Sequence, residues 1–262
     1  MNEPLAKKSL GQHWLYDVAS LHAMCEAADI GREDVVLEIG PGLGTLTEVL
    51  MSQAAQVIAV EFDEKLAAEL PHRVPPDNLH VIQQDILSFD FTSLPASYKV
   101  VANIPYYLTS NLIRVMSETP NPPQVAALLV QKEVAERVAA EPGSMSLLSV
   151  TAQYYWEVSL GQVVPAELFT PPPKVNSQIL ILTLRPQPLF PDVDSKEFFR
   201  LVKAGFAQRR KTLLNSLSTG LHLSREAVQS WCQKAGIDPQ RRPQTLSLDD
   251  WYSLYKFGSR SE

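Results

Sequence analysis

The tetrapeptide Asn103-Ile104-Pro105-Tyr106 carries the most specific chemistry in the sequence. It offers two hydrogen-bond acceptors side by side: the side-chain oxygen of Asn103 and the carbonyl of Ile104, which is held extended because a proline follows it. When two acceptors receive hydrogen bonds from both N–H groups of an exocyclic adenine amine, the nitrogen is drawn toward a tetrahedral geometry. Its lone pair then points away from the acceptors. Tyr106 adds an aromatic face on which a flipped-out base can stack. The motif therefore predicts a site that activates an adenine amine, although a strand with a proline turn is the purely structural interpretation.

A glycine-rich turn, Gly40-Pro41-Gly42-Leu43-Gly44, directly follows the apolar run 35–39. Such a turn between a strand and a helix lets the backbone approach a ligand closely. Glu61 ends the next apolar run, 21 residues after Gly40, where a carboxylate can accept from both hydroxyls of a ribose. Asp85 follows the third run and is placed to accept from an adenine amino group. Together these residues predict an adenosine ligand without a pyrophosphate, because the glycine spacing departs from G-x-G-x-x-G.

These two groups of residues fit transfer of a methyl group from a sulfonium donor that carries an adenosine. The donor leaves as a neutral thioether, so positioning, worth roughly 7–11 kcal/mol, can supply the catalysis without a strong base or a metal. The two cysteines, Cys25 and Cys232, are far apart and lack the spacing of metal ligands. We therefore predict no metal site and no disulfide.

The elements that must position these side chains alternate as in an α/β protein. Short runs rich in β-branched residues predict strands at 35–39, 57–61, 79–83, 99–103, 125–130, 156–164 and 178–184. A proline-rich stretch, 165–174, separates the last two and cannot form a crossover helix, which predicts an antiparallel end to a mainly parallel sheet. No strand pattern reappears after 185–191, where three prolines interrupt regular structure. We expect one domain over residues 1–185 and a second over 186–262.

Residues beyond this boundary show the pattern of helices. Apolar side chains recur at helical spacing over 198–206. Ser224 is a capping residue for a helix that stops at Gly236, and Ser247 with Asp250 three residues later resembles a capping box. The second domain is therefore expected to be small and all-helical.

Charge is distributed unevenly along the chain. The net charge is −6, yet residues 186–262 hold 12 Lys and Arg against 8 Asp and Glu, so the rest of the chain is strongly acidic. This asymmetry predicts that the helical domain meets the phosphates of a nucleic acid. The candidate phosphate contacts are Arg200, Lys203, Arg209, Arg210 and Lys211 on a helix-like stretch, with Arg241 and Arg242 as a second cluster.

Four segments together resemble the ribosomal RNA adenine N6-dimethyltransferase family over nearly the whole chain. They are 9–13 (Ser-Leu-Gly-Gln-His), 37–47 (Leu-Glu-Ile-Gly-Pro-Gly-Leu-Gly-Thr-Leu-Thr), 103–110 (Asn-Ile-Pro-Tyr-Tyr-Leu-Thr-Ser) and 169–175 (Phe-Thr-Pro-Pro-Pro-Lys-Val). The C-terminal segments 208–213 and 242–247 resemble signatures of the branch that acts on the bacterial small subunit. The resemblance implies a Rossmann-like class I S-adenosylmethionine-dependent methyltransferase sheet with a small all-α C-terminal domain.

The resemblance also implies roles for individual residues. Gly40 would lie against the methionine part of the cofactor, and Phe169 would face Tyr106 across the target base. The expected cofactor is S-adenosyl-L-methionine, bound by Gln12, His13, Leu15, Gly40, Gly42, Gly44, Glu61, Asp85, Ile86 and Asn103. The expected catalytic residues are Asn103, Ile104, Pro105, Tyr106 and Phe169.

The implied activity is dimethylation of the N6 amino group of two adjacent adenosines in the 3′-terminal hairpin of small-subunit (16S) rRNA during ribosome biogenesis. The expected partner is small-subunit rRNA or a precursor of the 30S subunit, with the protein acting as a monomer. No apolar run approaches the length of a membrane span, and no apolar segment follows Lys7 and Lys8 as in a secretory signal. We therefore expect a cytoplasmic protein without a membrane partner.

Three alternatives remain open. The first is the same chemistry on large-subunit RNA, as in the macrolide-resistance methyltransferases, which the C-terminal signatures disfavour. The second is a binding protein that acts in ribosome assembly without catalysis, which the intact Glu61, Asp85 and 103–106 disfavour. The third is a dinucleotide oxidoreductase, which the glycine spacing disfavours.

Overall fold

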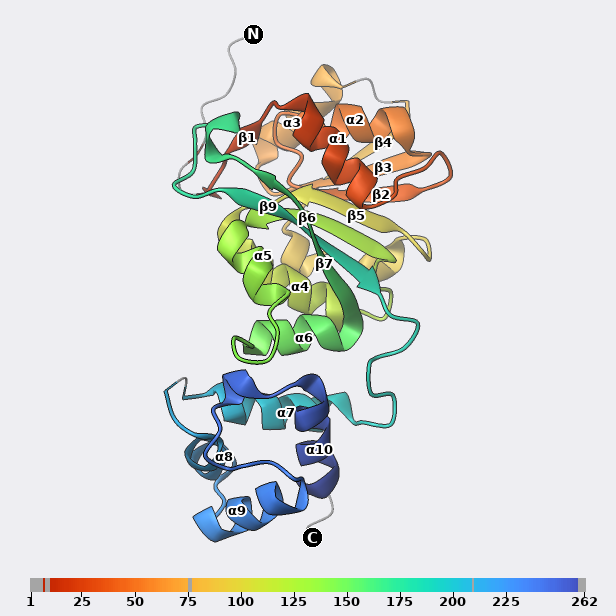
Figure 1. Cartoon of the computed structure of the whole chain (residues 1–262). Helices are drawn as coiled ribbons and strands as arrows, with labels where there is room; N and C mark the ends of the chain where they lie inside the picture. The colour runs from red at the N-terminus through yellow and green to blue at the C-terminus, as the bar shows by residue number, and fades with distance from the viewer. Residues whose placement is uncertain (1–6, 8–9, 75–76, 209, 259–262) are drawn as a thin grey trace. The chain divides into compact units, whose positions relative to one another are not determined.

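The computed structural model of the chain describes residues 7, 10–74, 77–208 and 210–258. The chain divides into two compact units (Figure 1), one of Met1–Glu136 and Glu157–Leu184 and the other of Arg137–Trp156 and Arg185–Glu262. The division differs from the expected domains 1–185 and 186–262 in the segment 137–156, which belongs to the second unit. Side chains of this segment join the core of the helical unit, a tertiary contact that composition along the chain does not reveal.

Seven strands of the first unit form one sheet in the order β4-β3-β2-β5-β6-β9-β7. Their bounds are β2 (Val35–Ile39), β3 (Gln56–Glu61), β4 (Leu79–Gln83), β5 (Lys99–Asn103), β6 (Val125–Gln131), β7 (Trp156–Val164) and β9 (Ser177–Leu184). The strands from β4 to β6 in this order pair in parallel, whereas β9 pairs antiparallel to β6. These pairings confirm the predicted α/β class and the antiparallel end of the sheet.

The central strands β2, β5 and β6 are buried along almost their whole length, as expected for a parallel sheet covered on both faces. Figure 1 shows α1, α2 and α3 on one side of the sheet and α4 and α5 on the other. The bounds of these helices are α1 (Val18–Ala27), α2 (Thr45–Gln53), α3 (Glu64–Arg73), α4 (Thr109–Glu118) and α5 (Lys132–Val138). The unit is a Rossmann-like three-layer structure.

The strand order reverses between β2 and β5, which are parallel neighbours with Leu37 opposite Val100. Such a reversal opens a crevice at the carboxyl ends of the strands. Further short elements of this unit are β1 (Trp14–Leu15), β8 (Phe169–Thr170), η2 (Ile86–Ser88), η3 (Phe91–Ser93), η4 (Tyr106–Leu108) and η5 (Ala166–Leu168). Strands β1 and β8 pair antiparallel as a separate two-stranded sheet, so the N-terminal segment is tied to a loop far along the chain.

The described elements of the second unit are helices, apart from Trp156 at the start of β7. These helices are α6 (Leu147–Tyr155), α7 (Ser195–Phe206), α8 (Leu213–Leu221), α9 (Arg225–Lys234), η6 (Pro243–Thr245) and α10 (Leu248–Gly258). Tyr154 of α6 stacks on Phe198 of α7 with ring centroids 5.2 Å apart. The fully buried Trp251 packs so tightly on α7 that a Cβ at Gly205 would lie 2.3 Å from its ring. An aromatic core therefore holds these helices together.

The predicted helix starts of this unit are confirmed. Ser224 caps α9 by accepting from the Ala227 N–H at 3.1 Å. The Ser247 hydroxyl accepts from the Asp250 N–H, and the Asp250 carboxylate accepts from the Ser247 N–H, each at 3.0 Å. This reciprocal pair is the expected capping box at the start of α10.

Candidate functional site

One cavity in the first unit brings the ends of neighbouring strands together with the N-terminal segment. It lies at the carboxyl ends of β2, β3, β4 and β5, where ligand sites of open parallel sheets occur. The predicted site residues that line it are Gln12, His13, Leu15, Gly40, Gly42, Glu61, Asp85, Ile86, Asn103, Ile104, Pro105 and Tyr106. Gly44 and Phe169 lie outside this lining.

The glycine turn after β2 brings backbone close to its neighbours. Gly40 and Gly42 have φ angles of +68° and +58°, in the left-handed region that favours glycine. A Cβ on Gly42 would lie 2.5 Å from the ring of Trp14, so β1 packs directly on the turn. At Gly40, no described atom lies within 4 Å of a Cβ position. The backbone at Gly40 is therefore open to the cavity.

Gly44 has a packing role in addition to its predicted contact with a cofactor. It is the N-cap residue of α2 with a φ of +92°, and a Cβ there would lie 2.7 Å from Val74 and 2.9 Å from Leu70. Its N–H donates to the Pro41 carbonyl oxygen at 2.9 Å. This glycine therefore allows α2 to pack against the end of α3, and its contact with the cofactor stays a prediction.

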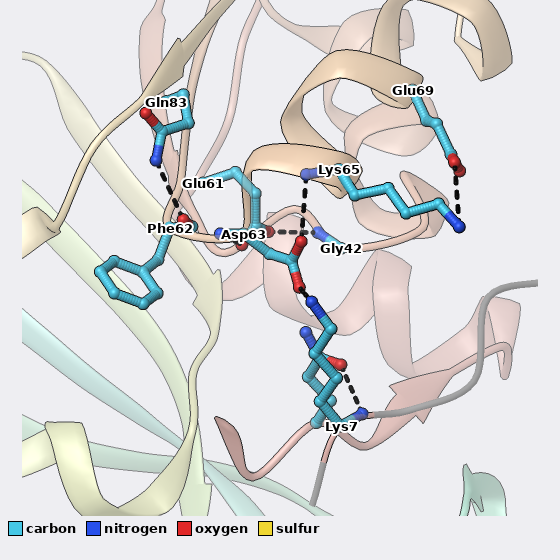
Figure 2. Close-up of polar contacts among 9 residues, drawn as sticks. Lys7, Gly42, Glu61, Phe62, Asp63, Lys65, Glu69 and Gln83 are labelled. Atoms are coloured by element: carbon cyan, nitrogen blue, oxygen red, sulfur yellow. Dashed lines mark hydrogen bonds and ion pairs between the residues drawn. The ribbon is translucent and has the colours of Figure 1, made fainter. Parts of the chain in front are cut away.

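Glu61 ends β3 and is held by two backbone N–H groups (Figure 2). Its Oε2 accepts from Gly42 at 3.1 Å and its Oε1 accepts from Asp63 at 2.8 Å. Burial raises the pKa of this carboxyl, and the backbone donors partly offset the effect. Each oxygen keeps a further lone pair, so the fixed carboxylate can accept from two adjacent hydroxyls of a ribose.

Asp63 ties the N-terminal segment to the same strand end. Its buried carboxylate accepts from the Lys65 N–H, which caps α3, and pairs with the Lys7 ammonium at 2.6 Å (Figure 2). Burial opposes ionisation, but the hydrogen bond and charge of Lys7 prevail and hold the pKa of Asp63 below its usual range. The Lys7 N–H donates to Gln12 Oε1 at 2.8 Å, so this contact also holds Gln12 in place.

Glu38 is a site residue that the sequence reasoning missed. It lies in β2, is 1% exposed and lines the cavity. Its Oε2 has no hydrogen-bond partner among the described residues, and burial raises the pKa of the carboxyl to about 8 against a smaller opposing effect of Thr47. An acid inside an otherwise apolar strand was the available signal, because a buried carboxyl is kept only where something pairs with it. A cationic ligand group would complete its surroundings.

Asp85 and Ile86 lie together after β4. Asp85 Oδ1 accepts from the Leu87 N–H at 2.9 Å, which caps η2, and the other oxygen of this exposed side chain can still accept from a ligand amine. Ile86 is 5% exposed and adds an apolar surface to the same cavity. The pair suits the polar edge and the face of a purine ring.

Asn103 ends β5 and its side-chain amide is oriented by the N-terminal segment. Its Nδ2 donates to the His13 carbonyl oxygen at 3.3 Å, which orients the amide and leaves Oδ1 as an acceptor. Ile104 is buried, and its carbonyl accepts no backbone hydrogen bond from the described residues. Pro105 follows with a φ of −55° and starts η4. Two acceptors thus lie at the end of β5, beside the cavity that Glu61 also lines.

Tyr106 is fixed at both its ring and its hydroxyl. The ring stacks on His13 with centroids 5.9 Å apart, and His13 Nδ1 lies 2.7 Å from the Pro171 carbonyl oxygen, to which it donates. Tyr106 Oη is hydrogen-bonded to Oγ of the fully buried Ser177 at 2.9 Å. Burial raises the pKa of Tyr106, so its hydroxyl stays neutral. Sequence reasoning missed Ser177 because its partner is 71 residues away.

Phe169 is a buried residue of the short β1–β8 pair. It lies opposite Leu15 in the β1–β8 pair, is 3% exposed and packs in the hydrophobic core with Val164. The ring in contact with Tyr106 is that of His13. The aromatic pair of Phe169 and Tyr106 across a target base stays a prediction.

The predicted phosphate-binding residues of α7 and the following turn are exposed. Arg200 and Lys203 lie on α7, where Arg200 pairs with Glu197 at 3.2 Å. Arg210 and Lys211 lie in the turn before α8, because α7 ends at Phe206 and does not continue as a helix-like stretch. Arg209 lies outside the described residues.

Arg241 has structural partners, whereas its neighbour Arg242 is exposed. Its guanidinium donates to the Thr245 carbonyl oxygen and hydroxyl and pairs with Asp250 at 3.0 Å. Arg241 therefore ties the preceding loop to the start of α10, and Arg242 is the better placed of the two for a phosphate.

The described part of the chain contains no group of His, Cys, Asp and Glu side chains that could hold a metal ion. Cys25 and Cys232 are both buried and unbridged. No helix in the described ranges has the length and apolar character needed to cross a membrane.

The strand order, the glycine turn after β2 and the acids at successive strand ends define a class I methyltransferase. Comparison with known families is more specific: the family model described as ribosomal RNA adenine dimethylase matches residues 4–259. The chain therefore belongs to the ribosomal RNA adenine dimethylase family.

Individual relatives agree with this assignment. A protein of Dehalococcoides mccartyi named ribosomal RNA small subunit methyltransferase A is 42% identical over 95% of this chain and 87% of the relative, and its namesake in Staphylococcus aureus is 40% identical over 95% and 89%. Among solved structures, a dimethyladenosine transferase from Plasmodium falciparum is similar with a TM-score of 0.78 and 27% identity over 94% of this chain and 98% of that one. The 23S rRNA methyltransferase ErmE is similar with a TM-score of 0.75 and 27% identity over 94% and 100%.

The chain is thus an S-adenosylmethionine-dependent methyltransferase, and the cavity residues fit this cofactor. Glu61 offers a fixed carboxylate for the ribose, and Asp85 offers an acceptor for the adenine amine. The unpartnered Oε2 of buried Glu38 matches the ammonium group of the methionine part. No residue in this set requires a metal.

Proposed function

We propose that this enzyme dimethylates the N6 amino groups of two adjacent adenosines in the 3′-terminal hairpin of small-subunit (16S) rRNA during ribosome biogenesis. One observation carries the proposal: a single cavity is lined both by Glu38 and Glu61 and by Asn103 and Ile104, whose oxygens suit the amine to be methylated. The names of the relatives at 40–42% identity support the small subunit as the substrate.

Methylation of large-subunit RNA is the weaker alternative. The 23S rRNA methyltransferase has the same fold but only 27% identity to this chain, well below the identity of the small-subunit relatives. The segments 208–213 and 242–247 favour the same choice. A protein without catalysis is disfavoured because the oxygen of Asn103 is oriented and left available.

We assign the cofactor-binding roles as follows. S-adenosylmethionine supplies an electrophilic methyl group on a sulfonium sulfur. Glu61 accepts hydrogen bonds from the ribose hydroxyls, Asp85 accepts from the adenine amine and Glu38 pairs with the ammonium group. The backbone at Gly40 lies against the methionine part, because its Cβ position is free of described atoms. Gln12, His13 and Leu15 close the cavity from the N-terminal side.

The roles toward the target adenosine rest on the end of β5. Asn103 Oδ1 and the Ile104 carbonyl accept the two N–H groups of the amine, which localises the nitrogen lone pair for attack on the methyl group. Tyr106 stacks on the flipped-out base, and its bond to Ser177 fixes the ring. Catalysis is then positioning, and no residue needs to act as a strong base.

The exposed cations Arg200, Lys203, Arg210, Lys211 and Arg242 are proposed to contact phosphates of the RNA. Contacts of this kind recognise the shape of a helix more than its sequence, which suits a pre-formed subunit as substrate. On the same resemblance, we propose that the protein acts as a monomer in the cytoplasm.

A substrate comparison tests the proposal. Purified protein and radiolabelled S-adenosylmethionine are incubated with unmodified small subunits, with naked small-subunit RNA and with large-subunit RNA, and the label is mapped to nucleotides. We expect N6,N6-dimethyladenosine at adjacent adenosines near the 3′ end of the small-subunit RNA. Label only in large-subunit RNA would establish the first alternative. Bound cofactor without any label would indicate a protein that lacks catalysis.

A further inference from the structure

The cavity that holds Tyr106 has a second aromatic residue at its mouth. Tyr107 lines the same cavity, yet it is 66% exposed. The two tyrosines are consecutive in η4, where successive side chains point about 120° apart. Tyr106 therefore reaches inward to Ser177, and Tyr107 faces the solvent.

The ring of Tyr107 is supported from one side. A Cβ built on Gly11 would lie 3.8 Å from both Cδ1 and Cε1 of this ring and 3.6 Å from Pro105. Gly11 has a φ of +63°, in the left-handed region that favours glycine. Because glycine has no side chain, its backbone itself lies close to η4. Tyr107 is otherwise open to solvent. Tyr107 is thus an exposed aromatic ring that is supported on one side and contributes little to the packing of the fold.

We propose that Tyr107 is the stacking platform for the nucleotide next to the target adenosine, an inference that rests on the proposed function. A base that leaves its strand to enter the cavity deprives its neighbour of a stacking partner. Because neighbouring nucleotides are joined by one phosphate, the neighbour of a base held at Tyr106 lies at the mouth of the cavity. Aromatic side chains at such positions bind unpaired bases by stacking. In one of the two reactions on adjacent adenosines the neighbour on the side of Tyr107 is the other adenosine, and a purine offers a large surface for this contact.

Phe62 provides a contrast within the same cavity. It is 58% exposed and also lines the cavity, but it directly follows Glu61, and its ring points away from the Asp63–Lys7 pair (Figure 2). Its carbonyl oxygen accepts from Gln83 at the end of β4. Phe62 therefore belongs to the cofactor side of the cavity, and Tyr107 belongs to the side formed by the end of β5.

Kinetics on unmodified small subunits test the proposal, with the full chain throughout. Tyr107→Ala is expected to lower kcat/KM for the subunit by about 5- to 150-fold, the loss that corresponds to one base–aromatic stack, mainly through KM. Its Kd for S-adenosylmethionine is expected to stay within about twofold of wild type, since the cofactor side is untouched. Tyr107→Phe keeps the ring and is expected to retain nearly full activity. Phe62→Ala is expected to weaken cofactor binding instead.

Three results would overturn the proposal while the wild type remains active. One is an unchanged kcat/KM in Tyr107→Ala. Another is an equal loss in Tyr107→Phe, which would assign the effect to the hydroxyl. The third is a large rise in the cofactor Kd of Tyr107→Ala. Failure of the proposed function itself would be distinguishable, because the wild type would then transfer no methyl group to the small subunit.

Discussion

Replacing Glu38 with Gln tests how the cofactor cavity is built, because the change removes one ionisable group and keeps its shape. Burial raises the pKa of this carboxyl from 4.5 to about 8, so the folded state binds its proton more tightly than the unfolded state. Stability contributed by such an acid is present at low pH and is lost as the pH rises from 4.5 toward 8. The side chain is 1% exposed, so solvent does not screen the effect.

The magnitude follows from the pH interval. Where the folded state holds one proton that the unfolded state does not, each rise of one pH unit lowers the free energy of unfolding by about 1.4 kcal/mol. Between about pH 5 and pH 7.5 the wild type should therefore lose about 3 kcal/mol relative to Glu38→Gln. Glu61 and Cys25 are the titratable groups that interact with Glu38, and both remain in the variant, so the difference between the two proteins isolates Glu38.

Urea unfolding of both proteins without cofactor, at several pH values across this interval, measures the difference. S-adenosylmethionine is expected to bind the variant more weakly, since the ammonium group loses an anionic partner. Binding to the wild type near neutral pH should release a proton, which calorimetry in buffers of different ionisation enthalpy detects. Equal pH dependence of the two unfolding free energies would refute the reasoning that Glu38 is buried, protonated and unpartnered.

Two further sets of substitutions test contacts that hold the site in place. Ser177→Ala removes the partner of the Tyr106 hydroxyl and should lower kcat by about fivefold, equivalent to about 1 kcal/mol, without changing the cofactor Kd. Tyr106→Phe should lower kcat by the same factor. If the loss of activation free energy in the double variant equals the sum of the two single losses, the two groups act separately. Gly44→Ala should lower the unfolding free energy by about 2–4 kcal/mol, because its Cβ would overlap Val74 and Leu70 at a left-handed φ. Gly236→Ala, with a φ of +72° and no described atom within 4 Å, is the matched control and should cost only about 1 kcal/mol in the same urea assay.

The strands were predictable because their signal is local. Runs such as 35–39, 79–83 and 99–103 are apolar and β-branched, and each is a strand with those bounds in the structure. The cavity at their carboxyl ends followed from the parallel arrangement, which brings Gly40, Glu61 and Asn103 to one edge of the sheet whatever the packing details.

Residues whose roles depend on distant partners were not predictable in the same way. Gly44 belongs to a glycine turn but packs against α3, and Phe169 belongs to a matched motif but is turned into the core by its pairing with Leu15. The segment 137–156 joins the second unit although it precedes the last strands in sequence. In each case the deciding contact lies between segments that no local pattern connects.

Predictions from charge have the same limit, because a cation can have a structural partner that the sequence does not reveal. Arg241 is the example. Sequence places it beside Arg242 in a basic pair, but in the structure its guanidinium binds Thr245 and Asp250. A run of cations predicts a positive surface only for those side chains that the fold leaves unpaired.

The most direct test of the account is methyl transfer by Asn103→Ala, measured together with its affinity for S-adenosylmethionine. In the proposed mechanism the side-chain oxygen of Asn103, whose amide is oriented by the His13 carbonyl, accepts from the amine. Transfer to unmodified small subunits should therefore fall by about 100- to 1000-fold, the scale for loss of one preorganised hydrogen-bonding group at a reacting centre. The cofactor Kd, measured by calorimetry, should change by less than about threefold, because Glu61 and Glu38 are untouched. Asn103→Asp, which keeps an acceptor oxygen, should retain more transfer than Asn103→Ala. Undiminished transfer in Asn103→Ala, or a loss of cofactor binding in parallel with transfer, would contradict the account.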